Sequence, residues 1–123
     1  MKKILLIEDD PFLVKLYAEI FTDEGYNFDS SVGGVGGLEK VKVGKPDLII
    51  LDIMIPEMNG LDVLDKLKAD SATKEIPVLI LTNLSSKEEE ERALKAGALK
   101  YLIKTQYEPE KLIQVVKQTV PPE

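Results

Sequence analysis

The sequence contains no cysteine and no histidine among its 123 residues. Without cysteine the chain can form neither a disulfide bond nor a thiolate metal site. Without histidine it has no imidazole for acid–base catalysis, for metal ligation or for carrying a phosphoryl group. Any metal site must therefore use carboxylate, carbonyl, amide or hydroxyl oxygens, which are the ligands of hard cations such as Mg²⁺ or Ca²⁺.

Positive charge of the kind that binds nucleic acid is also scarce. The formal net charge is −6, and Arg92 is the only arginine among 16 cationic residues. We therefore expect no direct binding to nucleic acid. Acidic residues at positions 8–10 end the first apolar run too early for a signal peptide, and no run has the length of a membrane span. These absences favour a cytoplasmic protein that does not contact the membrane.

What the sequence does contain is a set of four short, almost continuous apolar runs. Such runs indicate strands that are buried on both faces, as in a parallel sheet covered by helices. A fifth stretch is shorter and more polar, which is typical of an edge strand. In chain order the five predicted strands are Ile4–Ile7, Asn27–Ser31 (the edge strand), Leu48–Leu51, Val78–Leu81 and Tyr101–Ile103.

An amphipathic helical pattern follows each predicted strand. Asp10 and Pro11 suit the start of the first helix and Gly25 its end, while Ser86 and Gly97 suit the two ends of the fourth. Five β–α units with short connections predict a flavodoxin-like, doubly wound α/β fold with strand order 2-1-3-4-5. We expect residues 1–120 to form one domain and residues 121–123 to be a tail or the start of a linker. The other three predicted helices cover about Val35 to Val43, Leu61 to Ala69 and Pro109 to Thr119.

Polar residues follow the predicted strands at the edge where ligands of such sheets bind. They are Glu8 and Asp9 after the first strand, Asp52 after the third, Thr82 and Asn83 at the end of the fourth, and Lys104 after the fifth. Neighbouring carboxylates repel one another unless a cation neutralises them, and two or three carboxylates with open positions suit Mg²⁺ beside a phosphate. An aspartate can attack phosphorus, while a lysine and a threonine hydroxyl can bind phosphoryl oxygens.

In this order on this frame, the residues resemble the receiver domains of bacterial response regulators over nearly the whole chain. The matching pieces are Glu8-Asp9, Asp52, Pro56-Glu57-Met58-Asn59-Gly60, Thr82, and Tyr101 with Lys104. The resemblance implies a phosphorylation-dependent switch of two-component signalling rather than a turnover enzyme. It also implies a sensor histidine kinase or a phosphotransfer protein as donor. The signal would pass to a downstream effector protein or to a domain missing from this chain.

The resemblance implies a role for each matching residue. Asp52 resembles the phosphoacceptor and Lys104 the lysine that pairs with the phosphoryl group. Thr82 resembles the switch hydroxyl, and Tyr101 the aromatic residue that turns inward when the hydroxyl moves. The surface that reports this change would consist of the fourth helix, the fifth strand and the fifth helix. The implied Mg²⁺ ligands are Asp9, Asp52, Glu8 through a water molecule, and the backbone carbonyl of Met54.

Four residues are expected to tune this chemistry. Thr105 stands where receivers usually have a proline after a cis bond, and a cis bond before a residue other than proline costs on the order of 3–4 kcal/mol. The bond is therefore either strained or trans, with a reshaped loop. Asn83 stands where a small residue is usual. Met54 and Leu84 occupy the two positions that, in the family they resemble, tune hydrolysis of the acyl phosphate. Since neither side chain can orient a water molecule, we expect a long-lived phosphorylated form.

Other functions agree with parts of the sequence. A receiver-like adaptor would bind partners without being phosphorylated, and Thr105 and Asn83 leave that alternative open. An aspartyl-nucleophile phosphatase of the haloacid dehalogenase type would have a second acid two residues after its nucleophile, where this chain has Met54. A flavodoxin would need a phosphate loop after the first strand, where this chain has acids. The segment Gly33-Gly34-Val35-Gly36-Gly37 lacks the lysine and hydroxyl of a P-loop, so we interpret it as a flexible helix start.

Overall fold

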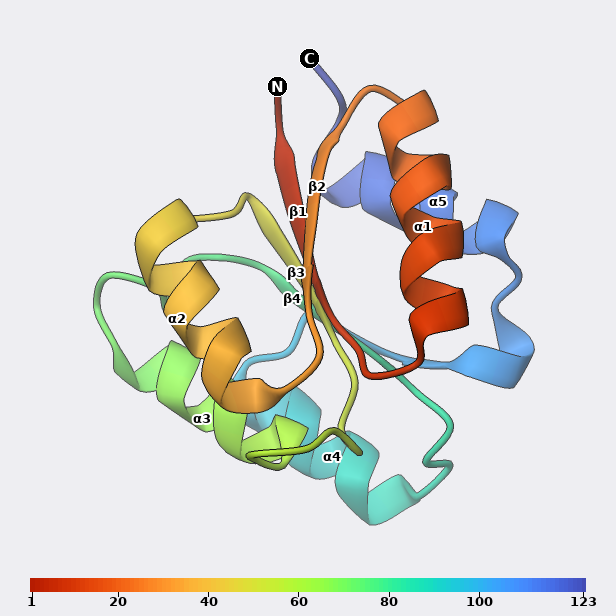
Figure 1. Cartoon of the computed structure of the whole chain (residues 1–123). Coiled ribbons are helices and arrows are strands. Elements are labelled where there is room, and N and C mark those ends of the chain that lie inside the picture. The colour runs from red at the N-terminus through yellow and green to blue at the C-terminus, as the bar shows by residue number, and fades with distance from the viewer.

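The computed structural model describes all 123 residues, which form one five-stranded parallel sheet with helices on both faces (Figure 1). The strand order is β2-β1-β3-β4-β5, so the predicted flavodoxin-like class and strand order are confirmed. The strands are β1 (Lys3–Ile7), β2 (Asn27–Ser31), β3 (Leu48–Leu51), β4 (Val78–Thr82) and β5 (Lys100–Ile103). The edge strand β2 and the central strand β3 have the predicted bounds, and the others differ by one residue at one end.

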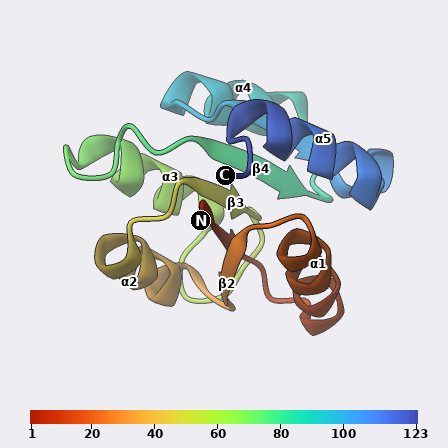
Figure 2. The same cartoon turned by 90° about the horizontal axis from the view of Figure 1, so that it is seen from above.

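Two layers of helices cover the sheet (Figure 2). The helices are α1 (Pro11–Asp23), α2 (Gly34–Gly44), α3 (Gly60–Ala69), α4 (Lys87–Ala96) and α5 (Pro109–Thr119), with a short 3₁₀ helix, η1 (Lys104–Gln106), before α5. Buried side chains of α1 and α5 pack on one face of the sheet, and those of α2, α3 and α4 pack on the other. No helix combines the length and the apolar character needed to cross a membrane.

The helix ends follow the local signals in the sequence. The Asp10 carboxylate accepts a hydrogen bond from the Phe12 N–H at 2.9 Å, and the Ser86 hydroxyl accepts one from the Glu89 N–H at 3.4 Å. Gly97 ends α4 with a φ of 113°, and Gly25 follows α1 with a φ of 92°, conformations that glycine adopts at little cost. Both predicted N-caps and both predicted glycine ends are therefore confirmed.

The sheet has a buried layer of side chains on each face. Leu5 and Ile7 of β1 belong to the cluster beneath α2 and α3, while Ile4 and Leu6 belong to the cluster beneath α1 and α5. Every residue of β3 and β4 is buried, which explains why their sequences are continuously apolar rather than alternating. This rigid sheet fixes the positions of the residues that follow its strands.

Candidate functional site

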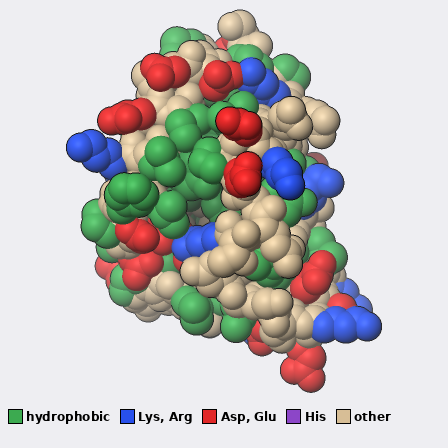
Figure 3. Space-filling view, turned by 90° about the vertical axis from the view of Figure 1, so that its right-hand side faces the viewer, with side chains coloured by type: hydrophobic (Ala, Val, Ile, Leu, Met, Phe, Trp, Pro, Cys, Tyr) green, Lys and Arg blue, Asp and Glu red, His purple; other side chains and the backbone are tan.

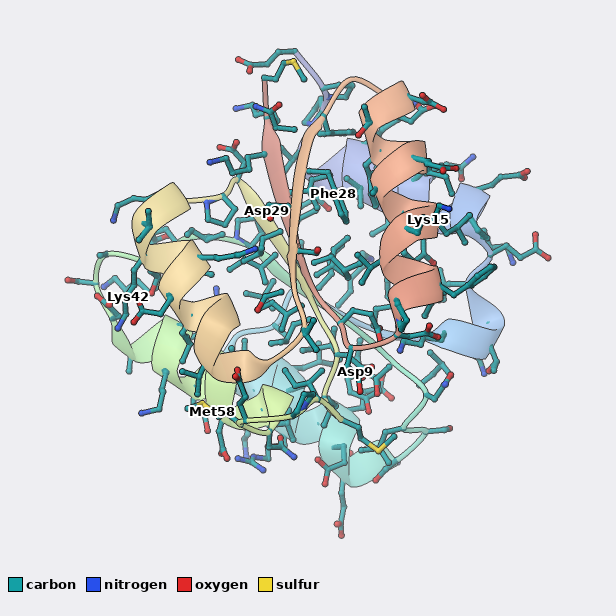
Figure 4. The ribbon with its side chains drawn as sticks, in the orientation of Figure 1. Asp9, Lys15, Phe28, Asp29, Lys42 and Met58 are labelled. Atoms are coloured by element: carbon teal, nitrogen blue, oxygen red, sulfur yellow. The ribbon has the colours of Figure 1, made fainter.

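Three carboxylates meet at the carboxyl edge of the sheet. Strands β1 and β3 pair with Ile7 opposite Leu51, so the residues that follow them, Glu8 and Asp52, lie side by side. Both are buried, with exposed fractions of 2% and 5%, whereas Asp9 is exposed. Carboxylate oxygens of the three residues lie within 4.8 Å of one another. Figure 4 labels Asp9 at this end of the strands, in the loop between β1 and α1.

Lys104 joins the two buried carboxylates. Its ammonium nitrogen lies 2.6 Å from Glu8 Oε1 and 2.7 Å from Asp52 Oδ2. It is the first residue of η1, and the peptide bond to Thr105 is trans, like every other peptide bond of the chain. Of the two alternatives for this bond, the trans one is therefore present, and the turn of η1 still directs Lys104 into the pocket.

Burial shifts the pKa of Glu8 and that of Lys104 each in one direction, and the contacts between Lys104 and the carboxylates shift each of them in the opposite direction. Burial raises the pKa of Glu8 above 4.5, and the nearby charge of Asp52 adds to that effect, while hydrogen bonds from Lys104 and the Asp10 N–H oppose it. Burial alone would lower the pKa of Lys104, but its hydrogen bonds to Asp52 and Glu8, together with the negative charges of both residues, outweigh burial and raise it. With all groups ionised, three carboxylates and one ammonium leave a local charge of −2, which matches a divalent cation.

Thr82 and Tyr101 meet at the backbone of Leu84. Thr82 is buried at the end of β4, and its hydroxyl oxygen accepts a hydrogen bond from the Leu84 N–H at 3.2 Å. The Tyr101 hydroxyl, on β5, donates to the Leu84 carbonyl at 2.5 Å. The structure therefore connects the two predicted switch residues through one loop residue. Neither side chain forms a hydrogen bond with the carboxylates.

The loop from β3 to α3 folds back on Asp52. Asp52 Oδ1 accepts a hydrogen bond from the Met54 N–H at 3.3 Å, and the Gly60 N–H donates to the Ile53 carbonyl at 2.8 Å. A Cβ atom on Gly60 would lie only 2.1 Å from the Asp52 carbonyl oxygen, so the loop can close here only with glycine. Met54 presents an exposed side chain above this turn.

The remaining predicted tuning residues follow the carboxyl ends of β4 and β5. Asn83 and Thr105 are exposed and Leu84 is half-buried. The face covered by α1 and α5 shows acidic and apolar side chains intermixed, with basic side chains scattered singly or in pairs (Figure 3). The roles of these residues in tuning stay predictions.

One long-range contact of the loop has no counterpart in the sequence-based predictions. The Glu57 carboxylate accepts hydrogen bonds from the N–H groups of Val35 and Gly36, both at 3.1 Å, and so caps α2. The segment from Gly33 to Gly37 is a helix start, as predicted, but its N-cap residue Gly33 has no side chain to cap it. That missing local cap was the available signal that a residue elsewhere must supply one.

The doubly wound sheet and the acidic pocket at its carboxyl edge define a class of flavodoxin-like α/β protein with a group of carboxylates at the ends of its central strands. Residues 4–117 match the family model described as the response regulator receiver domain. The chain belongs to this family of two-component signalling proteins.

Two curated relatives and one solved structure illustrate the family. The chain is 33% identical over 103 residues to the polar-differentiation response regulator DivK of Brucella anthropi, covering 84% of each protein. It is 36% identical over 104 residues to the DNA-binding dual master transcriptional regulator RpaA of Synechocystis sp.; that match covers 85% of this chain but 43% of RpaA. The crystal structure of the BeF3-activated N-terminal receiver domain of Klebsiella pneumoniae RstA superimposes with a TM-score of 0.88, at 29% identity, covering 96% and 97% of the two chains.

Proposed function

We propose that this protein is a cytoplasmic signalling switch that accepts a phosphoryl group on Asp52 with Mg²⁺ beside it. The observation that carries the proposal is the buried pair of Glu8 and Asp52, which share Lys104 and lie with Asp9 in one group of carboxylates. The donor is a sensor histidine kinase or a phosphotransfer protein. The output is a changed surface over α4, β5 and α5, which binds a downstream effector protein or a domain outside this chain.

The donor set of the pocket fits Mg²⁺. Asp9, Asp52 and the Met54 carbonyl would hold it directly and Glu8 through a water molecule, an all-oxygen set of the kind that Mg²⁺ prefers. When bound, the ion neutralises the charge that builds up on the phosphoryl oxygens. The local charge of −2 around Lys104 is the property of this structure that supports such an ion.

Asp52 and Lys104 have different roles in the phosphoryl transfer. A carboxylate oxygen of Asp52 attacks the phosphorus atom; the new O–P bond forms as the P–N bond to the donor histidine breaks, and the donor nitrogen keeps the electron pair. Because the carboxylate already carries the attacking electrons, no general base is needed. Lys104, which pairs with Asp52 Oδ2 at 2.7 Å, then binds a phosphoryl oxygen, and it keeps its positive charge throughout.

The conformational signal starts at Thr82. Its hydroxyl leaves the Leu84 N–H and donates a hydrogen bond to the phosphoryl group. That movement frees the Leu84 backbone, so Tyr101 exchanges its bond to the Leu84 carbonyl for an inward position. The shared contact of both side chains with Leu84 supports this route from the pocket to the surface of α4 and β5.

The proposal is tested by incubating the protein with Mg²⁺ and acetyl phosphate and measuring its intact mass. We expect a single added phosphoryl group that disappears in Asp52→Asn and in the presence of a chelator. Absence of an adduct under any condition would favour the adaptor that binds without phosphorylation. Repeated turnover of unrelated phosphate esters would favour the phosphatase.

The lifetime of the acyl phosphate is the second property to measure. Met54 and Leu84 present apolar side chains near the pocket, so neither positions an attacking water molecule, and the phosphorylated form decays slowly. The variant Met54→Asn adds an amide that can orient water, and it should shorten the lifetime measured by loss of the added mass. Decay of the parent protein as fast as that of the fastest chemotaxis receivers would refute the slow lifetime.

A further inference from the structure

The first turn of α2 receives all its capping from the loop that follows Asp52. The Gly34 N–H donates to the Pro56 carbonyl at 3.1 Å, and the next two N–H groups, those of Val35 and Gly36, both donate to Glu57 Oε1 at 3.1 Å. These are successive donors at the helix start that would otherwise lack acceptors. A carboxylate is a favourable acceptor here because the helix dipole concentrates positive charge at this end.

The backbone on both sides is shaped to permit this contact. A Cβ atom on Gly33 would lie 2.3 Å from Glu57 Oε1, and one on Gly34 would lie 2.8 Å from the Met58 carbonyl oxygen. Glu57 itself has a φ of 74°, a left-handed conformation that side chains other than glycine rarely adopt. Such strain persists only where surrounding contacts enforce it, and here the cap supplies them.

The same loop carries the backbone carbonyl that we assign to the Mg²⁺ site. Met54 lies between Asp52 and Glu57, and its N–H bonds to Asp52 Oδ1 at the long distance of 3.3 Å. One end of the loop is fixed where Gly60 packs on the Asp52 backbone. The other side is fixed at the start of α2, where Figure 4 labels Met58 beside the helix.

We propose that Glu57 is a positioning residue, whose cap on α2 holds the loop so that the Met54 carbonyl faces the Mg²⁺ site. This inference rests on the proposed function of the pocket. The side chain of Glu57 touches neither the ion nor the phosphoryl group; it acts through the backbone of residues 54–57. Loss of the cap lets the loop relax from its strained conformation, and Mg²⁺ then binds more weakly.

The test measures the dissociation constant of Mg²⁺ by calorimetry in four proteins: the parent, Glu57→Ala, Glu57→Gln and Gly33→Ala. Glu57→Ala removes the acceptor and should weaken binding on the order of tenfold, as loss of a residue that supports a metal ligand commonly does. Glu57→Gln removes the same charge but keeps the acceptor oxygen, so its dissociation constant should stay near the parent value. Gly33→Ala displaces the carboxylate and should reproduce the effect of Glu57→Ala.

Three further measurements separate positioning from mere stabilisation. Circular dichroism establishes that each variant is folded at the temperature of the titration. The double variant Gly33→Ala with Glu57→Ala should bind Mg²⁺ no more weakly than Glu57→Ala alone, because both changes break one contact. In amide NMR spectra, Mg²⁺ should shift the signals of Val35 and Gly36 in the parent and less in Glu57→Ala.

The possible outcomes distinguish this proposal from the function on which it rests. If the parent binds Mg²⁺ and Glu57→Ala binds it equally well but melts earlier, Glu57 is only structural and the positioning role is wrong. If Glu57→Gln binds as weakly as Glu57→Ala, the charge rather than the cap is responsible, and the role is again wrong. If the parent itself binds no Mg²⁺, the proposed metal site fails and the positioning role fails with it.

Discussion

Lys104 is the counter-charge of two buried carboxylates, and this single residue governs the electrostatics of the pocket. Its side chain is 14% exposed and contacts Glu8 and Asp52 at 2.6 and 2.7 Å. A lysine in this position neutralises part of the charge that would otherwise attract a divalent cation. We therefore expect Lys104 to stabilise the fold in the absence of Mg²⁺ and to compete with the proposed Mg²⁺ for the same carboxylates.

We predict that Lys104→Ala lowers stability and raises affinity for Mg²⁺. With the ion chelated, the loss of the buried partner should cost about 3 kcal/mol in the free energy of unfolding, measured with urea. Saturating Mg²⁺ should restore much of the lost stability. Phosphorylation of the variant by acetyl phosphate should be weaker than that of the parent. The control is Lys117→Ala, which removes a more exposed ion pair with Glu24 and should cost under about 1 kcal/mol. Equal or weaker Mg²⁺ binding by Lys104→Ala would contradict the competition.

The raised pKa of Glu8 gives a second prediction, with a defined sign. Burial raises this pKa above 4.5, so the native protein binds the proton more tightly than the unfolded chain. This tighter proton binding stabilises the native protein at pH values below the pKa that Glu8 has in the unfolded chain. The stabilisation is lost as the pH rises through the higher pKa that Glu8 has in the native protein. Glu8→Gln cannot ionise, so without Mg²⁺ its stability relative to the parent should increase as the pH rises above 4.5, the ordinary pKa of a glutamate. Urea unfolding at several pH values checks this, and a difference that stays constant with pH would refute it.

At the scale of helices and strands, local sequence patterns predicted most of the strands and most of the helix ends. Continuous apolar runs identify the buried strands because a parallel sheet covered on both faces leaves them no polar side. Asp10, Ser86, Gly25 and Gly97 mark helix ends because capping depends on neighbouring residues. The strand order then brought Glu8 and Asp52 together, as predicted.

Contacts between distant segments were not predictable in the same way. The cap of α2 by Glu57 joins positions 21 and 22 residues apart, and the direction of Lys104 depends on the turn of η1. The pairing of Lys104 with Glu8 also emerges only from the folded geometry, since it requires both side chains to leave water together. Sequence patterns carry periodicity and local caps, but side-chain pairings of this kind depend on tertiary packing.

The turn from Asp52 to α3 supplies a prediction at this scale. In Gly60→Ala the new Cβ would lie 2.1 Å from the Asp52 carbonyl oxygen and 2.7 Å from Ile53 Cα. Backbone atoms cannot give way as a flexible side chain does, so we expect a loss of at least about 2 kcal/mol and reduced phosphorylation of Asp52. The matched control is Gly44→Ala, whose Cβ would meet only the end of the Lys3 side chain, at 3.3 Å. Its stability, measured by thermal unfolding, should be unchanged or higher by up to about 1 kcal/mol.

Considered as a whole, the molecule separates its scaffold from its site along the direction of the strands. The two termini lie together at the amino edge of the sheet, while the acidic pocket lies at the carboxyl edge (Figures 1 and 4). Two buried clusters of 14 and 13 residues fill the space between the edges, one on each face of the sheet. Changes at the amino edge should therefore alter the free energy of unfolding without altering the pocket.

Tyr26 tests that separation, because it secures the end of the chain to the amino edge. The residue is 1% exposed between α1 and β2, and its hydroxyl donates to the Val120 carbonyl at 2.7 Å. Tyr26→Phe leaves this carbonyl without its partner and should cost about 1–2 kcal/mol in the free energy of unfolding. The control Tyr107→Phe removes a hydroxyl that bonds to no other residue and should change stability little. At a temperature where both variants are folded, Mg²⁺ affinity and phosphorylation of Asp52 should equal those of the parent. A weakened pocket in Tyr26→Phe would mean that the two edges of the sheet are coupled.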